Sequence, residues 1–273
     1  MGLRNGLRLL YRAVDRFGLG AGLKAWWALA VPGAGLRAVR VPGFDHPIWL
    51  RAGTTDIASF EQVFLRGELD QRRFPQFRAL RAYARAAPQP CAVVDGGAYI
   101  GLSSLWLARD YPEATIFAVE PDPANFAMIQ RNTAAWPNIV PIQAGLWDHA
   151  TTLSLRREGF EPWGVRVGEA RGVVGGEGLA VPTVTINQLM AQAGASELLA
   201  VKLIIEGAEK AVFRSGLEWL DKTHHVIFMP SDWATPGDGA GKVAFAALAA
   251  RPFDWIVDGQ CVYCYRMAGK SLA

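Results

Sequence analysis

A glycine-rich loop holds the residues of this chain best suited to binding a ligand. An apolar segment, residues 92–94, ends at Asp95, and the chain then runs through Gly96 and Gly97 to Gly101, where a helical pattern begins. Glycine lets a backbone turn sharply and approach a ligand closely, and the first amides of a helix attract anionic groups. The glycines do not have the G-x-G-x-x-G spacing of dinucleotide-binding loops. The loop therefore predicts a different ligand at the end of a central strand.

A second acid supports this interpretation. Glu120 follows the next predicted strand, about 20 residues beyond the loop, where an acid can bind ribose hydroxyls. Asp95, with glycines two and six residues later, is similar to the pattern by which methyltransferases hold the amino-acid end of S-adenosylmethionine. The two acids together predict S-adenosylmethionine as the cofactor. The residues expected to contact it are Asp95, Gly96, Gly97, Ala98, Tyr99, Gly101, Glu120, Pro121 and, beside the adenine, Asp148.

The elements around these residues alternate between strand and helix. Strands are expected at residues 91–95, 115–119, 139–143, 199–205 and 226–229, and helices at residues 102–109, 123–135, 185–192, 210–219 and 242–250. The turn Asp258-Gly259-Gln260 predicts a hairpin between strands at 254–257 and 261–266. The glycine-rich residues 159–178 are expected to be irregular. The pattern predicts an α/β, Rossmann-like fold with a mostly parallel seven-stranded sheet and a C-terminal antiparallel hairpin, the architecture of class I methyltransferases.

Ordered motifs make the chain similar to a known family. Over roughly residues 50–265 the sequence resembles the FkbM-type methyltransferases, which implies a class I fold, S-adenosylmethionine, and O-methylation of a hydroxyl on a sugar, lipid or natural product. The matching segments are Gly53-Thr54-Thr55-Asp56, Phe60-Glu61-Gln62-Val63-Phe64, Val94-Asp95-Gly96-Gly97-Ala98, Tyr111-Pro112, Val119-Glu120-Pro121-Asp122, Gln130-Arg131-Asn132, Pro137-Asn138-Ile139, Thr183-Val184-Thr185-Ile186, Lys202 and Glu206-Gly207-Ala208-Glu209.

Five positions depart from the family pattern. Tyr99 replaces an Asn, Asn187 and Ile204 each replace an Asp, Met229 replaces a Glu, and Ser231 replaces a His. The acceptor pocket is expected to include Ile204, Glu206 and Met229, with helix capping as an alternative role for the glutamate.

The departures remove groups that could bind a metal or a proton. A hard divalent cation needs oxygen ligands, so we expect no bound metal. The remaining candidates for a catalytic base are Asp232 and His149. His224 and His225 are also candidates, but we expect both at the surface.

The N-terminal segment, residues 1–88, is helical and basic, and residues 89–273 are expected to form the cofactor-binding domain. Residues 1–90 contain 14 Lys and Arg against 6 Asp and Glu, a net charge of +8. Residues 3–17 place Leu and Arg at helical spacing, in two stripes. This helix could lie on a membrane surface or dock a partner through residues 3–30, or it could pack on its own domain. We further expect a short strand at 48–51 and helical structure over 57–86 with a break near Pro75.

Composition limits the location and the partners of the protein. Cys91, Cys261 and Cys264 are too few for a disulfide framework, which fits a reducing, cytoplasmic compartment, with peripheral contact at the inner membrane surface as a further option. Cys261 and Cys264 fall on opposite faces of one predicted strand. The expected partner is a small-molecule, glycan or lipid acceptor, and nucleic acid is not expected, because aromatic residues do not interleave with a basic patch. The sequence does not indicate an oligomeric state.

Three hypotheses stay open at this point. The chain could be an active methyltransferase with an apolar acceptor pocket that works by proximity. It could instead be a family member, natural or engineered, that keeps the cofactor but has lost or replaced methyl transfer. The third possibility is a protein whose working part is the basic N-terminal helix.

Overall fold

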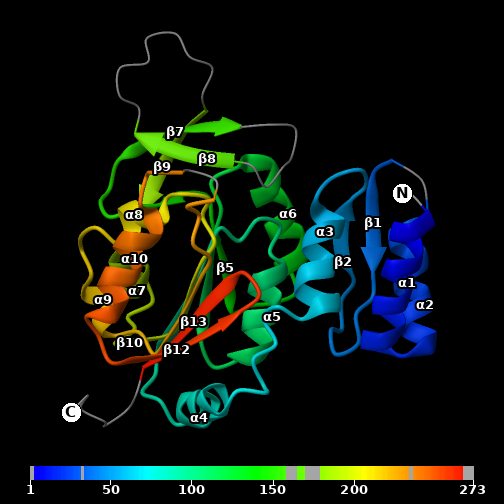
Figure 1. The fold of residues 1–273 in the computed structure, drawn as a ribbon, viewed down its shortest axis with the longest axis horizontal. Helices are drawn as coiled ribbons and strands as arrows, with labels where there is room; N and C mark the ends of the chain where they lie inside the picture. The colour runs from blue at the N-terminus through cyan, green and yellow to red at the C-terminus, as the bar shows by residue number, and fades with distance from the viewer. Residues whose placement is uncertain (1–2, 32–33, 158–164, 170–178, 234–235, 267–273) are drawn as a thin grey trace.

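The structure is a computed structural model that describes residues 3–31, 34–157, 165–169, 179–233 and 236–266. Its centre is a seven-stranded sheet in the order β12-β13-β11-β10-β3-β4-β5 (Figure 1). The strands are β3 (Cys91–Gly96), β4 (Thr115–Val119), β5 (Ile139–Ile142), β10 (Glu197–Leu203), β11 (His225–Phe228), β12 (Phe253–Asp258) and β13 (Cys261–Arg266). Neighbouring strands are parallel except that β13 runs antiparallel to β11 and β12. The expected Rossmann-like α/β fold with a C-terminal antiparallel hairpin is confirmed.

Helices cover both faces of this sheet. Side chains alternate along each strand, so Val93 belongs to one buried cluster and Val94 to the other. The first cluster lies under α5 (Leu102–Asp110) and α6 (Pro123–Thr133). The second lies under α7 (Ile186–Gln192), α8 (Glu209–Val212), α9 (Glu218–Asp221) and α10 (Ala240–Ala249). Cys261 and Cys264 fall in different clusters, as their spacing predicts, and both are buried free thiols.

Local signals set where the helices begin. Asp122 caps α6: its Oδ1 accepts hydrogen bonds from the backbone N of Ala124 and of Asn125, both at 2.9 Å, and Pro123 is the first helical residue. Thr185 caps α7 in a reciprocal capping box with Gln188. These caps fix each helix directly after the strand end that precedes it.

The order of the strands determines where a ligand can bind. β3 lies between β4 and β10, so the chain moves outward to one side of β3 first and later to the other. In open α/β sheets, ligands bind beyond the carboxyl ends of the strands at such a reversal. The loop after β3 lies at this place.

A second, smaller sheet follows β5. It has the order β6-β9-β7-β8 and contains β6 (Gly145–Leu146), β7 (Thr152–Arg157), β8 (Val165–Glu169) and β9 (Leu179–Val184). The expected irregular region therefore contains a strand, β8, while the rest of residues 159–178 lies outside the described residues. The helix expected at 210–219 was wrong in its length, since two short helices, α8 and α9, stand there.

The N-terminal segment packs against the large sheet's helices. It comprises α1 (Leu3–Phe17), α2 (Leu19–Ala30), β1 (Leu36–Val39), β2 (Ile48–Arg51), α3 (Asp56–Phe60), a π-helical segment η1 (Glu61–Arg66) and α4 (Pro75–Ala84). The helix at 3–17 and the strand at 48–51 are confirmed, and the expected break before Pro75 spans residues 67–74. Leu9 and Phe64 of this segment belong to the same buried cluster as Leu105 of α5. The division of the chain at residue 88 stays a prediction.

Candidate functional site

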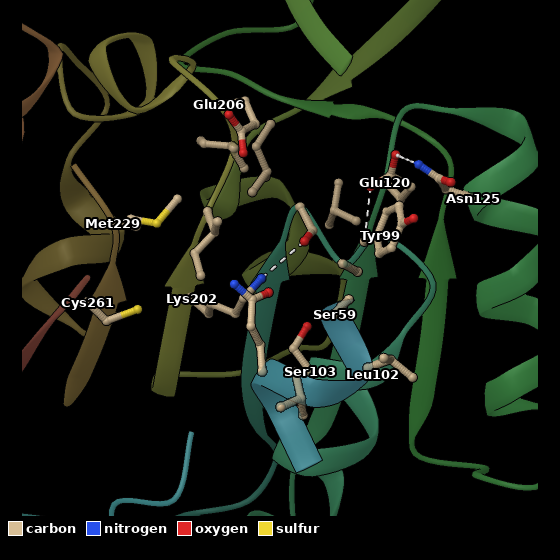
Figure 2. A pocket seen from close by; sticks show the side chains of 18 of the residues that line it. Ser59, Tyr99, Leu102, Ser103, Glu120, Asn125, Lys202, Glu206, Met229 and Cys261 are labelled. Carbon is tan, nitrogen blue, oxygen red and sulfur yellow. Dashed lines mark hydrogen bonds between the residues drawn. The ribbon is translucent and has the colours of Figure 1, made fainter. Parts of the chain in front are cut away.

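A cavity of about 540 Å³ opens beyond the carboxyl ends of β3, β4 and β10. Figure 2 shows Glu120 and Asn125 on one side of the cavity and Met229 and Cys261 on the other, with Lys202 between them. The lining comes from the loop after β3, from the ends of β4 and β10, and from α3 and η1 of the N-terminal segment. The lining residues are Ser59, Gln62, Val63, Glu68, Leu69, Gly97, Ala98, Tyr99, Leu102, Ser103, Val119, Glu120, Pro121, Asn125, Gly145, Leu146, Lys202, Ile204, Ile205, Glu206, Ala208, Met229, Trp233, Gln260 and Cys261.

Asp95 has a fully buried carboxylate that other side chains hold in place. Its Oδ1 accepts a hydrogen bond from Lys202 Nζ at 2.8 Å, and its Oδ2 accepts from the hydroxyls of Ser103 and Ser104, both at 2.6 Å. Lys202 Nζ also donates to the carbonyl oxygens of Gly96 (3.2 Å) and Gly97 (3.1 Å). A buried charge is stable only when it is paired and hydrogen-bonded, and this pair meets both conditions. Asp95 therefore fixes the loop and the start of α5, and it does not line the cavity itself.

The loop after β3 takes a shape that requires glycine. Gly97 has a φ of +68°, and a Cβ there would lie 2.0 Å from the carbonyl oxygen of Ile204. The loop is thus pressed against the end of β10. Gly96 and Gly101, two more predicted contacts, do not line the cavity, whereas Ala98 and Tyr99 do.

Glu120 is a buried carboxylate at the cavity wall. Its Oε2 accepts a hydrogen bond from the backbone N of Tyr99 at 3.0 Å, and its Oε1 accepts from Asp122 N at 3.1 Å and Asn125 Nδ2 at 3.2 Å. Burial raises the pKa of Glu120 to about 7, although these hydrogen bonds act in the opposite direction. A carboxylate that retains acceptor capacity and faces a cavity is suited to hydroxyl donors from a ligand.

The N-terminal segment connects to Glu120 through a closed set of hydrogen bonds. Arg51 donates to both carboxylate oxygens of Asp56 at 2.9 and 3.0 Å, and also to Asn125 Oδ1 at 2.8 Å. The hydroxyl of Tyr99 donates to Asp56 Oδ1 at 2.6 Å. Asn125 and the backbone of Tyr99 both reach Glu120, so the set closes on itself. Although burial opposes it, the hydrogen bonds from Arg51 and Tyr99 lower the pKa of Asp56, which stays ionised.

Backbone strain marks the cavity. Tyr99 and Glu206 are the residues other than glycine with positive φ in the described part of the chain, at 54° and 51°, and both line the cavity. Such conformations are costly and tend to cluster at functional sites. Glu209 holds the strained loop after β10: its carboxylate accepts from the backbone N of Ile205 at 3.0 Å and of Gly207 at 2.8 Å.

The cavity side opposite Glu120 is mostly apolar. The predicted pocket residues Ile204, Glu206 and Met229 all line the cavity. Val63 and Leu69 of the N-terminal segment add further apolar side chains to the lining. Besides Glu120 and Asn125, the lining includes the polar side chains of Ser59, Gln62, Glu68, Ser103, Lys202, Glu206 and Gln260.

The predicted catalytic residues Asp232 and His149 lie outside the cavity lining, and so does Asp148, which was expected beside the adenine. Asp148 accepts hydrogen bonds from Arg214 at 2.8 and 3.0 Å and pairs with His149 at 2.8 Å. Neither Asp148 nor His149 lines the cavity. Asp232 accepts from the backbone N of Gly241 at 2.9 Å and thereby caps the start of α10. The structure therefore gives Asp148, His149 and Asp232 structural partners and does not bring them to the cavity.

Other departures from the family pattern also lie away from the cavity. Ser231 is buried and donates to Glu209 at 2.8 Å, and Asn187 donates to Glu218 at 2.9 Å. The expectation that His225 lies at the surface was wrong. It is fully buried, and stacks on Tyr265 with ring centroids 4.2 Å apart, because β11 enters the sheet at this residue.

Sequence reasoning missed several residues of the site. Asn125 is within the first turn of α6, five residues after Glu120, and its place on that helix was a usable signal. Asp56 appeared only within the matching segment Gly53-Thr54-Thr55-Asp56, and neither it nor Arg51 indicated a place in the site, because their link to Glu120 depends on how the N-terminal segment docks. In the part of the chain that the structure describes, no group of three or more His, Cys, Asp or Glu side chains is arranged to hold a metal ion.

Comparisons with known proteins give short matches to methyltransferases. No family model matches the chain. Methyltransferase sdnD of Sordaria araneosa is 44% identical over 66 residues, which is 23% of this chain and 26% of that protein. Methyltransferase 1 of Beauveria bassiana is 47% identical over 71 residues, which is 25% of this chain and 28% of that protein. The chain thus matches about a quarter of the length of these curated relatives.

Solved structures with a similar outline are distant in sequence. A precorrin-6y C5,15-methyltransferase from Geobacter metallireducens is 12% identical with a TM-score of 0.34, covering 70% of this chain and 88% of the other. A SAM-dependent O-methyltransferase from Thermotoga maritima is 9% identical with a TM-score of 0.30, covering 88% of this chain and 80% of the other. Likeness at this level carries no argument about activity.

Proposed function

We propose that this protein is an S-adenosylmethionine-dependent methyltransferase of the FkbM type that methylates a hydroxyl on an acceptor with an apolar body. One observation carries the proposal: the buried carboxylate of Glu120 faces a cavity beside a glycine loop that leads into a helix, at the reversal of a parallel sheet. The short matches to named methyltransferases support the same activity.

The residues around the cavity fit the chemical groups of this cofactor. Glu120 would accept hydrogen bonds from the ribose hydroxyls, and Pro121 and Leu146 offer an apolar slot for the adenine. Leu102 and Ser103, in the first turn of α5, would lie against the carboxylate of the methionine part, which a helix N-terminus favours. When bound, the cofactor supplies an activated methyl group on a sulfonium. The ion pair between Asp95 and Lys202 keeps the loop after β3 rigid.

The remaining wall indicates what the acceptor is like. Ile204 and Met229 offer neither charge nor hydrogen bonds, so the acceptor's body is apolar, as in many lipids and natural products. This wall excludes water and aligns the nucleophile, and alignment alone supplies a large part of the rate of a displacement. Glu206 lines the cavity two residues after Ile204 and is our candidate for receiving the hydroxyl proton.

Calorimetry with S-adenosylhomocysteine tests the cofactor part of the proposal. We expect saturable binding by the wild type and a loss of at least about tenfold in affinity for Glu120→Ala, since a hydrogen bond to a charged group contributes about 1.5–3 kcal/mol. Glu218→Ala, at an exposed glutamate on α9, is the control and should bind normally. No heat from the wild type would overturn the proposal.

Transfer of a radiolabelled methyl group to an extract tests the reaction itself. We expect label in the fraction that partitions into organic solvent, and Glu206→Gln should slow its appearance. Binding of the cofactor without any transfer would instead favour the alternative that this protein keeps the cofactor but has lost or replaced methyl transfer. That alternative draws on one observation, which is that Asp232 and His149 lie outside the cavity.

A further inference from the structure

The helical hairpin α1–α2 presents an apolar surface to solvent. Figure 1 shows the hairpin at one end of the molecule's longest axis. Of the large apolar side chains exposed in the described chain, five belong to this hairpin, which is a small part of the molecule. They are Leu7, Tyr11, Leu19, Leu23 and Trp27.

Two arginines of the hairpin face the protein and help to set its rotation. On α1, Arg12 pairs with Glu61 of η1, and Arg16 pairs with Asp70 at 2.7 Å. These ion pairs fix the rotation of the helix and leave Leu7 exposed one turn before Tyr11. The hairpin also has an ordinary buried apolar side, formed by Leu9 of α1 and by Ala25 and Leu29 of α2, so the exposed apolar side chains form a second apolar face.

The exposed residues of the two helices lie on one common face. Trp26 donates from its indole N to the carbonyl oxygen of Gly6 at 3.0 Å, and Gly22 approaches Val14 closely, so these four residues mark the seam between the helices. On α2 the exposed residues at 19, 23 and 27 recur every fourth position, as one stripe. Helical geometry puts this stripe and the exposed stripe of α1 on the same side of the seam, away from η1 and β1.

The composition of this face matches a membrane–water interface. Tyr11 and Trp27 are 71% and 66% exposed, and such aromatic side chains favour the headgroup level of a bilayer. Arg4 and Lys24 are exposed on these helices, against one exposed acid, Asp15, while Arg8 is exposed but also pairs with Glu61 at 3.7 Å. Basic residues beside an apolar helical face favour anionic lipids. No described helix is long and apolar enough to cross a bilayer, so contact through this face would be peripheral.

We infer that the α1–α2 hairpin docks this protein on the surface of an anionic membrane. The apolar side chains enter the outer part of the bilayer, and Arg4 and Lys24 lie against the lipid headgroups. The inference does not rest on the proposed enzymatic function, because it uses no residue of the cavity.

Sedimentation of the full chain with vesicles tests the inference. We expect the wild type to bind vesicles made of equal parts phosphatidylcholine and phosphatidylserine, and to bind pure phosphatidylcholine more weakly. Trp27→Ser should lower the partition onto mixed vesicles about tenfold, since it removes the largest apolar side chain of the face. Leu19→Ser is a second variant at an exposed position and should act in the same direction. Lys24→Glu should reduce binding to mixed vesicles and leave binding to phosphatidylcholine unchanged.

Trp233→Ser is the matched control, because Trp233 is 70% exposed but belongs to the cavity rim. We expect it to bind vesicles like the wild type, and an equal loss in both tryptophan variants would overturn the inference. Absence of wild-type binding to mixed vesicles would overturn it as well. A wild type that is dimeric by light scattering, becomes monomeric with Trp27→Ser and ignores vesicles would assign this face to a second copy of the chain instead.

Discussion

Replacing Glu120 by Gln should change how stability depends on pH. Burial raises the pKa of Glu120 from an ordinary 4.5 to about 7 in the folded protein. Between these values the folded protein binds the proton and the unfolded chain does not, so the free energy of unfolding falls as pH rises. One pKa unit corresponds to about 1.4 kcal/mol, which makes the total loss about 3 kcal/mol by the time pH exceeds the folded pKa.

Glutamine keeps the size of the side chain and cannot titrate. Its amide oxygen can still accept a hydrogen bond from the backbone of Tyr99 or from Asn125. We therefore expect the free energy of unfolding of Glu120→Gln not to show the decline with pH that Glu120 causes in the wild type. From acidic to alkaline pH, the free energy of unfolding of the variant should rise by about 3 kcal/mol relative to that of the wild type. Urea unfolding followed by tryptophan fluorescence, at a series of pH values, measures the difference. Glu218→Gln is the control, and the difference between its free energy of unfolding and that of the wild type should not change with pH.

The same carboxylate should act in the opposite direction on ligand binding. Ribose hydroxyls donate to an ionised carboxylate, so the affinity of the wild type for S-adenosylhomocysteine should rise as pH passes through about 7. The affinity of Glu120→Gln should be lower and lack this rise. Parallel stability curves for wild type and variant would show that Glu120 does not titrate as a buried acid, and would refute the reasoning.

Three further substitutions test the scaffold, each by urea unfolding. Gly97→Ala should destabilise by about 2 kcal/mol or more, because a Cβ would lie 2.0 Å from the carbonyl oxygen of Ile204 at a positive φ; an unchanged midpoint would contradict that packing. Lys202→Met should cost about 3–5 kcal/mol, since it leaves the Asp95 carboxylate buried without its partner, and adding Asp95→Asn should recover part of it. His225→Phe should stabilise by about 1 kcal/mol, because neither ring nitrogen has a hydrogen-bond partner among the described residues; a clear loss would point to a hidden polar contact.

The sequence predicted the fold because the relevant signals are local. Continuous apolar runs in the strands, a period near four in the helices, and the turn at Gly259 depend on residues close together in the chain. The same holds for Glu120 and the glycine loop, since each directly follows its own strand. The carboxyl ends of parallel strands meet at one edge of a sheet, so these residues had to converge.

Tertiary packing decided which polar side chains face the cavity. Asp148, His149 and Asp232 have the right chemistry for a site, yet each finds a partner nearby that holds it elsewhere. A sequence does not reveal such competition, because the energy of a polar group depends on whichever donor or acceptor happens to lie within reach.

The N-terminal helix shows the same division. Its apolar and basic stripes were evident from the sequence, but not that Leu9 enters the core while Leu7 and Tyr11 stay exposed. The rotation of the helix depends on Glu61 and Asp70, which lie about fifty residues further along the chain than Arg12 and Arg16 and become their partners only when the segment docks. A periodic pattern fixes the relative orientation of side chains on one helix, whereas the direction in which the helix is rotated is set by the charges and surfaces that fold against it.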